Sequence, residues 1–472
     1  MSVILFGQSY FLRFDPKLWR AMQPYPPLGT LYAASYLRDK GFDVALFDAM
    51  LAQSTTEWDS ALNTVRPTYA VIYEDNFNYL SKMCLLRMRE AAFAMIASAK
   101  EAGAAAIVAG ADASDNPQEY LSKGADFVIV GEGEETLSEL LFCLDGKDRR
   151  DPSQIPGVAT KQSPIPCAPR EIVRELDELP FPAWDLVDLE RYRRIWKERH
   201  GYYSINMVTT RGCPYQCNWC AKPIWGQRYH SRSPENVIQE MVFLRDLIQP
   251  DHIWFVDDIF GLKNGWVEKF SQLALEQGVR TPFKCLLRTD LVNESLAAAL
   301  AAAGCEMVWL GAESGAQKVL DAMEKGAKVE DTYRATRLLR EVGIKVAYFL
   351  QFGYPGEGWS EIRQTFRMVR DNMPDDIGVS VTYPLPGTRF YETVTLGRHR
   401  NWIDSEDLAL LFKGRFSPQF YRVLHRVLHK EYRARKVWRE WRRGRWASPL
   451  PVLKLSSLVF DRLNLRRLRV TR

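Results

Sequence analysis

Several absences in the 472-residue sequence limit what the protein can be. No apolar run approaches the ~18 residues that span a bilayer, and the longest candidate, LAAALAAAG, is far too short. The N-terminal stretch MSVILFGQSYFLRF has neither a cationic leader nor a small-residue cleavage site, so we expect no signal peptide. Eight cysteines are few for this length and do not resemble a secreted disulfide framework. A reducing cytoplasm is therefore the expected location.

Histidine is also scarce, with six residues in the chain, the first of them His200. A ligand held by the residues before His200 must therefore be bound without an imidazole. The hydrophobic fraction of 46% and the charged fraction of 26% are typical of a globular protein. The length predicts two or three domains.

The net charge of +5 conceals a basic C-terminal region. Residues 411–472 carry 18 Lys and Arg against 3 Asp and Glu, so the other 410 residues have a net charge of −10. Ser417 and Pro418 predict the start of a helix. Apolar residues recur along it at helical spacing: Phe420, Leu424, Val427, Leu428, Tyr432 and Trp438. The helix could pack on the rest of the chain with a solvated cationic face, lie on an anionic membrane or bind RNA.

The first part of the chain, residues 1–144, has the pattern of a doubly wound α/β domain. Short apolar runs (SVILF, DVALF, YAVIY, AAAIVAG and DFVIVG) alternate with segments long enough for helices, which predicts a parallel sheet with helices on both faces. Ligands of such sheets bind at the carboxyl ends of the strands. Five segments are expected around that crevice: Gln8–Tyr10, Asp48, Glu74–Asn78, Gly110–Asp112 and Gly131–Glu134.

Residues 145–192 are rich in proline and lack periodicity, so we expect an ordered linker. Residues 193–395 contain six further strand candidates separated by helical segments, which fits a partial (β/α)6 barrel. Residues 396–472 form the basic helical region. Barrel chemistry lies at the C-terminal ends of strands. The candidates there are Asp257, Asp258, Arg288, Glu313, Ser314, Gly353–Glu357 and Pro384–Gly387.

The segment RGCPYQCNWC follows the first barrel strand and spaces three cysteines as C-x3-C-x2-C. Thiolates so arranged can ligate a [4Fe–4S] cluster or contribute to a zinc site, for which His230 is the candidate fourth ligand. The other cysteines are isolated, and most of them are expected at buried apolar positions: Cys84, Cys143, Cys167, Cys285 and Cys305. We favour a cluster held by three cysteines, with one iron left open.

This motif, with Trp219 just before its last cysteine, resembles that of the radical S-adenosylmethionine (SAM) superfamily. GCEMVWLGAESGAQKVLDAMEKG, FLQFGYPGE and YPLPGTRFYE stand where that family has its fourth, fifth and sixth strands. YPPLGTLYAASYLRDKGFDV and GADFVIVGEGEETLSELL resemble the first domain of its cobalamin-binding-domain subgroup. QRYHSRSPENVIQEM is similar to the branch that contains the anaerobic magnesium-protoporphyrin IX monomethyl ester cyclase. The resemblance covers residues 1–395.

The resemblance implies that Cys213, Cys217 and Cys220 hold the cluster and that SAM chelates its open iron. Reductive cleavage of SAM would give a 5′-deoxyadenosyl radical, and the first domain would bind cobalamin without a protein imidazole below the cobalt. The implied reaction is C-methylation or an oxidative cyclisation or rearrangement of a small apolar, tetrapyrrole or lipid-like substrate. No catalytic acid or base is assigned. The implied cofactor contacts are Trp219, Asp257, Arg288, Glu313, Ser314, Gly353 and Pro355.

For several of these residues a purely structural role is the alternative to a cofactor contact. Ser314 could cap a helix, Asp257 could cap a turn, and Arg288 could pair with Asp290. A flavodoxin or ferredoxin is the expected electron donor, and peripheral contact with the inner membrane face is an alternative to a purely cytoplasmic location.

Two other functions are alternatives. A tRNA-modifying methylthiotransferase would carry three more cluster cysteines in its first domain. Cys84, Cys143 and Cys167 instead fall in predicted helices and the linker, so nucleic acid is not an expected partner. A non-catalytic iron–sulfur or zinc module would leave the six barrel motifs unexplained. We therefore favour an enzyme.

Overall fold

The computed structural model describes residues 2–83, 85–220, 224–397, 400–444, 446, 448–453 and 455–470. Cys84 lies outside the described residues. The chain divides into two compact units, each treated by itself. Unit 1 comprises Met1–Pro214, Ala221–Phe283 and Asn401–Glu406, and unit 2 comprises Tyr215–Cys220, Lys284–Arg400 and Asp407–Arg472. Within the described ranges, no helix is both long and apolar enough to cross a membrane.

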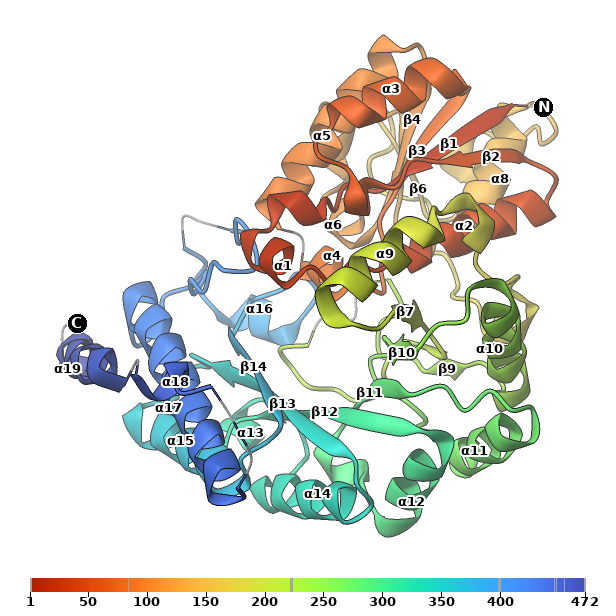
Figure 1. Ribbon diagram of the computed structural model, residues 1–472. Helices are drawn as coiled ribbons and strands as arrows, with labels where there is room; N and C mark the ends of the chain where they lie inside the picture. Colours follow the sequence, from red (N-terminus) through yellow and green to blue (C-terminus); the bar gives the residue numbers. More distant parts are fainter. Residues whose placement is uncertain are drawn as a thin grey trace. The chain divides into compact units, whose positions relative to one another are not determined.

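The N-terminal part of unit 1 is built on a six-stranded sheet (Figure 1). Its strands are β1 (Val3–Gly7), β2 (Asp43–Leu46), β3 (Tyr69–Tyr73), β4 (Ala105–Ala109), β5 (Phe127–Ile129) and β6 (Val158–Thr160). The strand order is β2-β1-β3-β4-β5-β6. All neighbours are parallel except β6, which pairs antiparallel with β5. The predicted doubly wound sheet is confirmed, while β6, which comes from the proline-rich segment, was not predicted.

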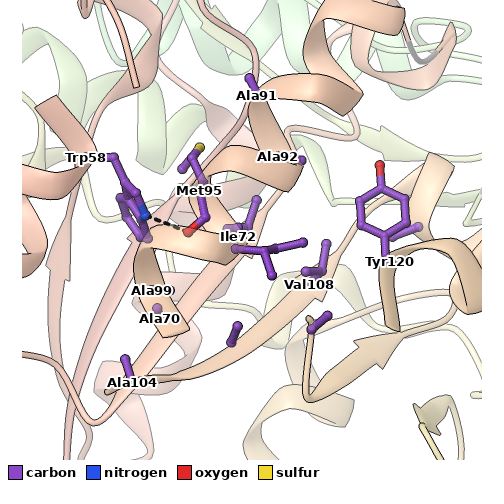
Figure 2. Close-up of a cluster of buried hydrophobic side chains, with 14 of the residues drawn as sticks. Trp58, Ala70, Ile72, Ala91, Ala92, Met95, Ala99, Ala104, Val108 and Tyr120 are labelled. Atoms are coloured by element: carbon purple, nitrogen blue, oxygen red, sulfur yellow. Dashed lines mark hydrogen bonds between the residues drawn. The ribbon is translucent and has the colours of Figure 1, made fainter. Parts of the chain in front are cut away.

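Helices cover both faces of this sheet because successive strand residues point to opposite sides. Leu5 belongs to the core beneath α3 (Thr56–Val65) and α5 (Leu86–Glu101), whereas Ile4 and Phe6 belong to the core beneath α2 (Leu28–Asp39) and α8 (Glu134–Leu144). Figure 2 shows the first core, in which the Trp58 indole nitrogen donates to the Met95 carbonyl oxygen at 3.0 Å. The helices of this part are α1 (Pro16–Ala21), α2 (Leu28–Asp39), α3 (Thr56–Val65), α4 (Tyr79–Met83), α5 (Leu86–Glu101), α6 (Ala111–Asp115), α7 (Pro117–Ser122), α8 (Glu134–Leu144) and α9 (Leu189–His200).

A second six-stranded sheet has the order β14-β13-β12-β11-β10-β7 and forms a parallel half-barrel. Its strands are β7 (Ser204–Met207), β10 (His252–Phe255), β11 (Phe283–Leu287), β12 (Cys305–Glu313), β13 (Lys345–Phe352) and β14 (Asp376–Val381). Helices between them are α10 (Pro234–Ile248), α11 (Trp266–Glu276), α12 (Glu294–Ala303), α13 (Gln317–Ala322), α14 (Val329–Glu341) and α15 (Trp359–Asn372). The predicted partial barrel of six strands is confirmed.

The C-terminal region of unit 2 contains α16 (Arg389–Thr393), α17 (Pro418–Arg442), α18 (Leu450–Leu453) and α19 (Leu455–Val470). The Ser417 hydroxyl accepts the Phe420 N–H at 3.3 Å, which confirms the predicted start of α17. The predicted apolar face is buried from Phe420 to Tyr432, but Trp438 is 51% exposed, so its assignment to that face was wrong. Val437, the residue before it, is buried instead.

Candidate functional site

Asp257, at the end of β10, fixes the start of the cysteine loop within unit 1. Its carboxylate accepts the backbone N–H groups of Thr209 and Thr210 at 2.7 and 2.6 Å and both of their hydroxyls at 3.0 and 2.9 Å. Burial raises the pKa of Asp257 to about 6, although these hydrogen bonds oppose the rise. The carboxylate thus has the turn-capping role, and a cofactor contact by Asp257 stays a prediction.

Two short strands, β8 (Thr210–Arg211) and β9 (His230–Ser231), pair antiparallel and bring the two ends of the cysteine loop together. Gly212 follows β8 with a φ of +77°, and a Cβ at this position would lie 2.2 Å from the Arg228 carbonyl oxygen. Only glycine fits this approach to the first cysteine.

Arg211 ties the same loop to the end of the first sheet. Its guanidinium is 3% exposed, bonds to the Glu132 carboxylate and donates to Glu134 Oε1 at 2.7 Å. The Trp225 indole nitrogen also donates to Glu132 Oε1, at 3.2 Å. Burial raises the pKa of Glu132, while Arg211 opposes that rise. Sequence reasoning missed this ion group, although both of its parts, RGC and GEGEE, stood out as motifs.

Within unit 2, Arg288 lies beside the second cysteine. Its Nη1 is 3.6 Å from the Cys217 sulfur, and its guanidinium carbon lies 3.7 Å from the centre of the Tyr215 ring. Two further nitrogens reach the Asp290 carboxylate at 3.0 Å each. The pairing with Asp290, one of the two predicted alternatives, is therefore present, and contact with SAM stays a prediction.

Lys325 joins two predicted site residues that the sequence separates. Its Nζ pairs with Glu313 Oε1 at 3.0 Å, and its carbonyl oxygen accepts from Arg288 Nη2 at 2.6 Å. Glu313 ends β12 with a φ of +55° after an irregular step in the strand. Ser314 is directed elsewhere, with its hydroxyl 3.2 Å from Thr365 Oγ1 and from the Ala316 nitrogen. Glu313, Lys325, Arg288 and Cys217 thus form one connected polar group, of which Lys325 was not predicted.

Asn218, which the motif did not mark, anchors the middle of the cysteine loop in unit 2. Its side-chain nitrogen donates to the Ala322 carbonyl at 2.9 Å, and its oxygen accepts from the Tyr354 hydroxyl at 2.8 Å. Its backbone carbonyl accepts the Phe390 N–H at 3.0 Å. The neighbouring Trp219 is half-buried, and its indole nitrogen has no hydrogen-bond partner among the described residues. That nitrogen is available to a bound molecule.

The remaining two predicted contacts lie after β13. Gly353 has a φ of +88°, and its N–H donates to Glu357 Oε2 at 2.6 Å. Burial raises the pKa of Glu357 to about 8. Pro355 is exposed. A Cβ on Gly353 would approach Leu410 to 2.8 Å, so the glycine serves close packing here.

Cys213 and Cys217 are buried, Cys220 is partly exposed, and none of the three forms a disulfide. In the described part of the chain, no three His, Cys, Asp or Glu side chains are grouped to hold a metal ion. Three thiols on one loop are nevertheless the donor set that iron–sulfur clusters use. The ligand set therefore stays a prediction from the motif.

A second polar site lies at the carboxyl ends of β1 and β3 in unit 1. Several buried side-chain atoms there have no hydrogen-bond partner among the described residues: Gln8 Nε2, Tyr10 Oη, Glu74 Oε2 and Asn76 Oδ1. The strand order changes direction between β1 and β3, which is where doubly wound sheets bind ligands. Buried polar atoms without partners are rare, so this edge fits a ligand with hydrogen-bonding groups of its own.

Other groups of the predicted crevice, among them the second carboxylate oxygen of Glu74, are used within the fold. Glu74 Oε1 accepts the Ser9 N–H at 3.0 Å, and burial raises the pKa of Glu74 to about 7. Asp48 accepts from the Tyr192 hydroxyl at 2.7 Å, and Asp112 pairs with Arg89. A separate hollow of about 1010 Å³ opens at the opposite edge, at the starts of β4 and β5, and does not belong to this site.

Comparison with known proteins gives two domain families. The family described as the radical SAM superfamily matches residues 207–369, and the B12 binding domain matches residues 20–141. The hopanoid C-3 methylase of Methylococcus capsulatus is 27% identical over 376 residues, which cover 78% of this chain and 68% of the methylase. The anaerobic magnesium-protoporphyrin IX monomethyl ester cyclase of Rubrivivax gelatinosus is 24% identical over 383 residues, which cover 78% of this chain and 66% of the cyclase.

The fold agrees with a solved structure of the radical SAM methyltransferase TsrM from Kitasatospora setae, which has cobalamin and a [4Fe–4S] cluster bound. The TM-score is 0.66 at 22% identity, over 83% of this chain and 74% of TsrM. At this identity the likeness is one of fold.

The chain thus contains a radical SAM domain at residues 207–369. With the B12-binding domain at residues 20–141 before it, the chain has both domains of the predicted subgroup, and its relatives indicate an enzyme of the methyltransferase or cyclase type. The predicted family is confirmed. The two family matches also agree with the predicted use of SAM and cobalamin.

Proposed function

We propose that this enzyme binds a [4Fe–4S] cluster through Cys213, Cys217 and Cys220, SAM at the open iron, and cobalamin at the β1/β3 edge of the first sheet. When bound, the cluster supplies the electron for reductive cleavage of SAM, and cobalamin supplies methyl-transfer or redox chemistry. The observation that carries the proposal is the fixing of the cysteine loop at a strand end of the half-barrel, where barrel chemistry takes place.

The chain's own residues hold this loop at several points. Asp257 fixes the residues before it, and Gly212 lets the backbone pass close to its far end. Asn218 fixes its middle, and Arg288 places an N–H donor next to the Cys217 sulfur. Hydrogen bonds to cluster sulfurs are among the factors that set the potential of such centres.

Charged and unsatisfied groups near the loop are candidates for SAM. Glu313 and Lys325 offer a carboxylate and an ammonium that suit the amino and carboxylate groups of SAM respectively. The Trp219 indole nitrogen offers a further donor. The Ser314 hydroxyl is used within the fold, by Thr365 and the Ala316 N–H, and Gly353 allows close packing.

Cobalamin suits the β1/β3 edge because its amide side chains can satisfy the buried atoms of Gln8, Tyr10, Glu74 and Asn76. The region matched by the B12-binding family contains no histidine. The lower face of the cobalt would therefore carry no imidazole from this domain.

Methyl transfer to a carbon atom is the first candidate reaction, because the hopanoid relative is a methylase and the structural neighbour is a methyltransferase. Oxidative cyclisation is the second, favoured by the cyclase relative. A small apolar, lipid-like or tetrapyrrole substrate and a flavodoxin- or ferredoxin-type reductant suit either reaction.

Anaerobic reconstitution tests the cluster. We expect about four irons per chain, a brown chromophore and SAM cleavage, all lost in Cys217→Ala. Cys167→Ala is the matched control, because Cys167 is exposed and lies outside the loop. A colourless, zinc-loaded protein with full activity would contradict the proposal.

Cobalamin binding is tested separately by adding hydroxocobalamin and recording the visible spectrum after gel filtration. Electron paramagnetic resonance of the Co(II) state should show no nitrogen splitting from a protein imidazole. Such splitting, or a failure to retain cobalamin, would refute the cobalamin part and leave the cluster part standing.

A further inference from the structure

Exposed apolar side chains are concentrated in one short part of unit 2. Of the fifteen large hydrophobic residues that are exposed in the described part of the chain, seven lie between residues 438 and 463. They are Trp438, Trp441, Trp446, Leu450, Val459, Phe460 and Leu463. These residues lie on or between the helices α17, α18 and α19, and we call these three helices together the tail hairpin. Scattered apolar residues are normal on a surface, but a concentration of this kind marks a binding surface.

The inner sides of the hairpin are already occupied. Tyr432 of α17 donates its hydroxyl to the Pro374 carbonyl at 2.9 Å, and Leu458 and Leu465 of α19 are buried. Lys430 pairs with Asp461 and Arg462 with Glu431, which fastens α19 alongside α17 (Figure 1). The exposed residues are therefore not left over from an unfolded tail but belong to the outer side of a packed helical pair.

On α19 the outward residues share one helix face. Val459, Phe460 and Leu463 lie within about 100° of arc, given a turn of 100° per residue. Arg466 and Arg467 continue the same face and are exposed. Phe460 is 74% exposed, so this apolar stripe faces solvent. An apolar stripe flanked by arginine is the pattern of helices that lie in the interface of a bilayer.

Positive charge is crowded at the neighbouring end of α17. The pKa of Arg439 is lowered, first by partial burial and then by the cations Arg443 and Arg340. Residues 411–472 carry a net charge of +15. This repulsion is relieved by a polyanionic surface. A nucleic acid would satisfy the charge but has no complement for aliphatic side chains such as Leu463, whereas a bilayer accepts both.

We propose that the tail hairpin docks the enzyme on the surface of an anionic lipid bilayer, with Phe460 and Leu463 inserted among the lipids and the arginines at the headgroups. This docking needs neither the cluster nor cobalamin, so it is independent of the proposed reaction.

Flotation of the full-length protein with vesicles tests the proposal. The vesicles are phosphatidylcholine alone or phosphatidylcholine with phosphatidylglycerol. We expect binding only to the second kind, weakened at least about tenfold between about 0.1 M and 0.5 M salt because screening shortens the range of the attraction. The double variant Phe460→Glu/Leu463→Glu should lower binding at least about tenfold. Removing residues 411–472 is unsuitable, because α17 packs on the barrel.

Leu275→Glu is the matched control, since Leu275 is 55% exposed on α11, the same fraction as Leu463. It should bind vesicles as the unmodified protein does. Circular dichroism must show that the double variant keeps its helices. A second variant, Arg466→Ala/Arg467→Ala, should reduce binding without adding charge to the apolar stripe.

Three results would overturn the proposal. The first is no flotation with anionic vesicles at low salt, and the second is flotation unchanged by both double variants. The third is binding of single-stranded RNA, lost in the same variants, while vesicles are ignored, which would assign the hairpin to nucleic acid.

Discussion

Replacing Arg211 by methionine tests whether the ion group with Glu132 and Glu134 holds unit 1 together. The three residues are each less than 5% exposed, and the methionine would leave two carboxylates buried without their cation. Removing one partner of a buried ion group costs about 3–5 kcal/mol. Holding a carboxyl protonated near pH 7 costs a similar amount, about 1.4 kcal/mol for each pH unit above its usual pKa.

The effect should depend on pH in a defined direction. Burial and the neighbouring Glu134 raise the pKa of Glu132 in the folded state, and without Arg211 nothing from that side chain opposes the rise. Groups with raised pKa values destabilise the fold as pH increases. The loss should therefore be largest near about pH 8, shrink toward about pH 5 and appear as a drop of about 10 °C in the unfolding temperature.

Thermal unfolding followed by circular dichroism measures this loss. Arg38→Met is the matched control, because Arg38 pairs with Asp185 on the surface and should cost less than about 1 kcal/mol. The triple variant Arg211→Met/Glu132→Gln/Glu134→Gln should recover much of the stability, since no buried charge remains. If Arg211→Met unfolds like the control, or its loss is the same at every pH, the group does not stabilise unit 1 as reasoned.

Two further changes address the loops at the strand ends. Asp257→Ala leaves four donors of Thr209 and Thr210 unsatisfied, so it should lower stability by about 2–4 kcal/mol and reduce the iron retained after reconstitution. Asp257→Asn should lose less stability and less iron. Equal iron contents and melting temperatures in the unmodified protein and both variants would rule this out. The pKa of Glu357 is raised to about 8, so the unmodified fold loses stability as pH rises from about 4.5 to 8. Glu357→Gln cannot ionise, so over that range its free energy of unfolding should rise relative to that of the unmodified protein by up to about 4 kcal/mol. Parallel pH–stability curves would show that the carboxyl does not titrate as expected.

Local patterns fixed most of the architecture in advance. The strand from Tyr69 to Tyr73 lies where the short apolar run YAVIY predicted it, because a continuous apolar run is typical of a buried parallel strand. The cap of α17 by Ser417 is equally local, as it joins residues three positions apart. The cysteine spacing and the late first histidine are properties of the sequence itself.

Only the tertiary structure decided which charged groups meet. Arg211 and Glu132 are 79 residues apart, and their pairing depends on which loops lie together at the ends of strands. The same holds for Lys325, which joins Glu313 to Arg288, and for β6, which needs the edge of β5 as a partner. Long-range contacts of this kind leave no periodic trace, because each side chain looks locally like an ordinary polar loop residue. Trp438 shows the same limit on a helix, because it is exposed although it lies five full turns from the buried Phe420 and so has the same angular position.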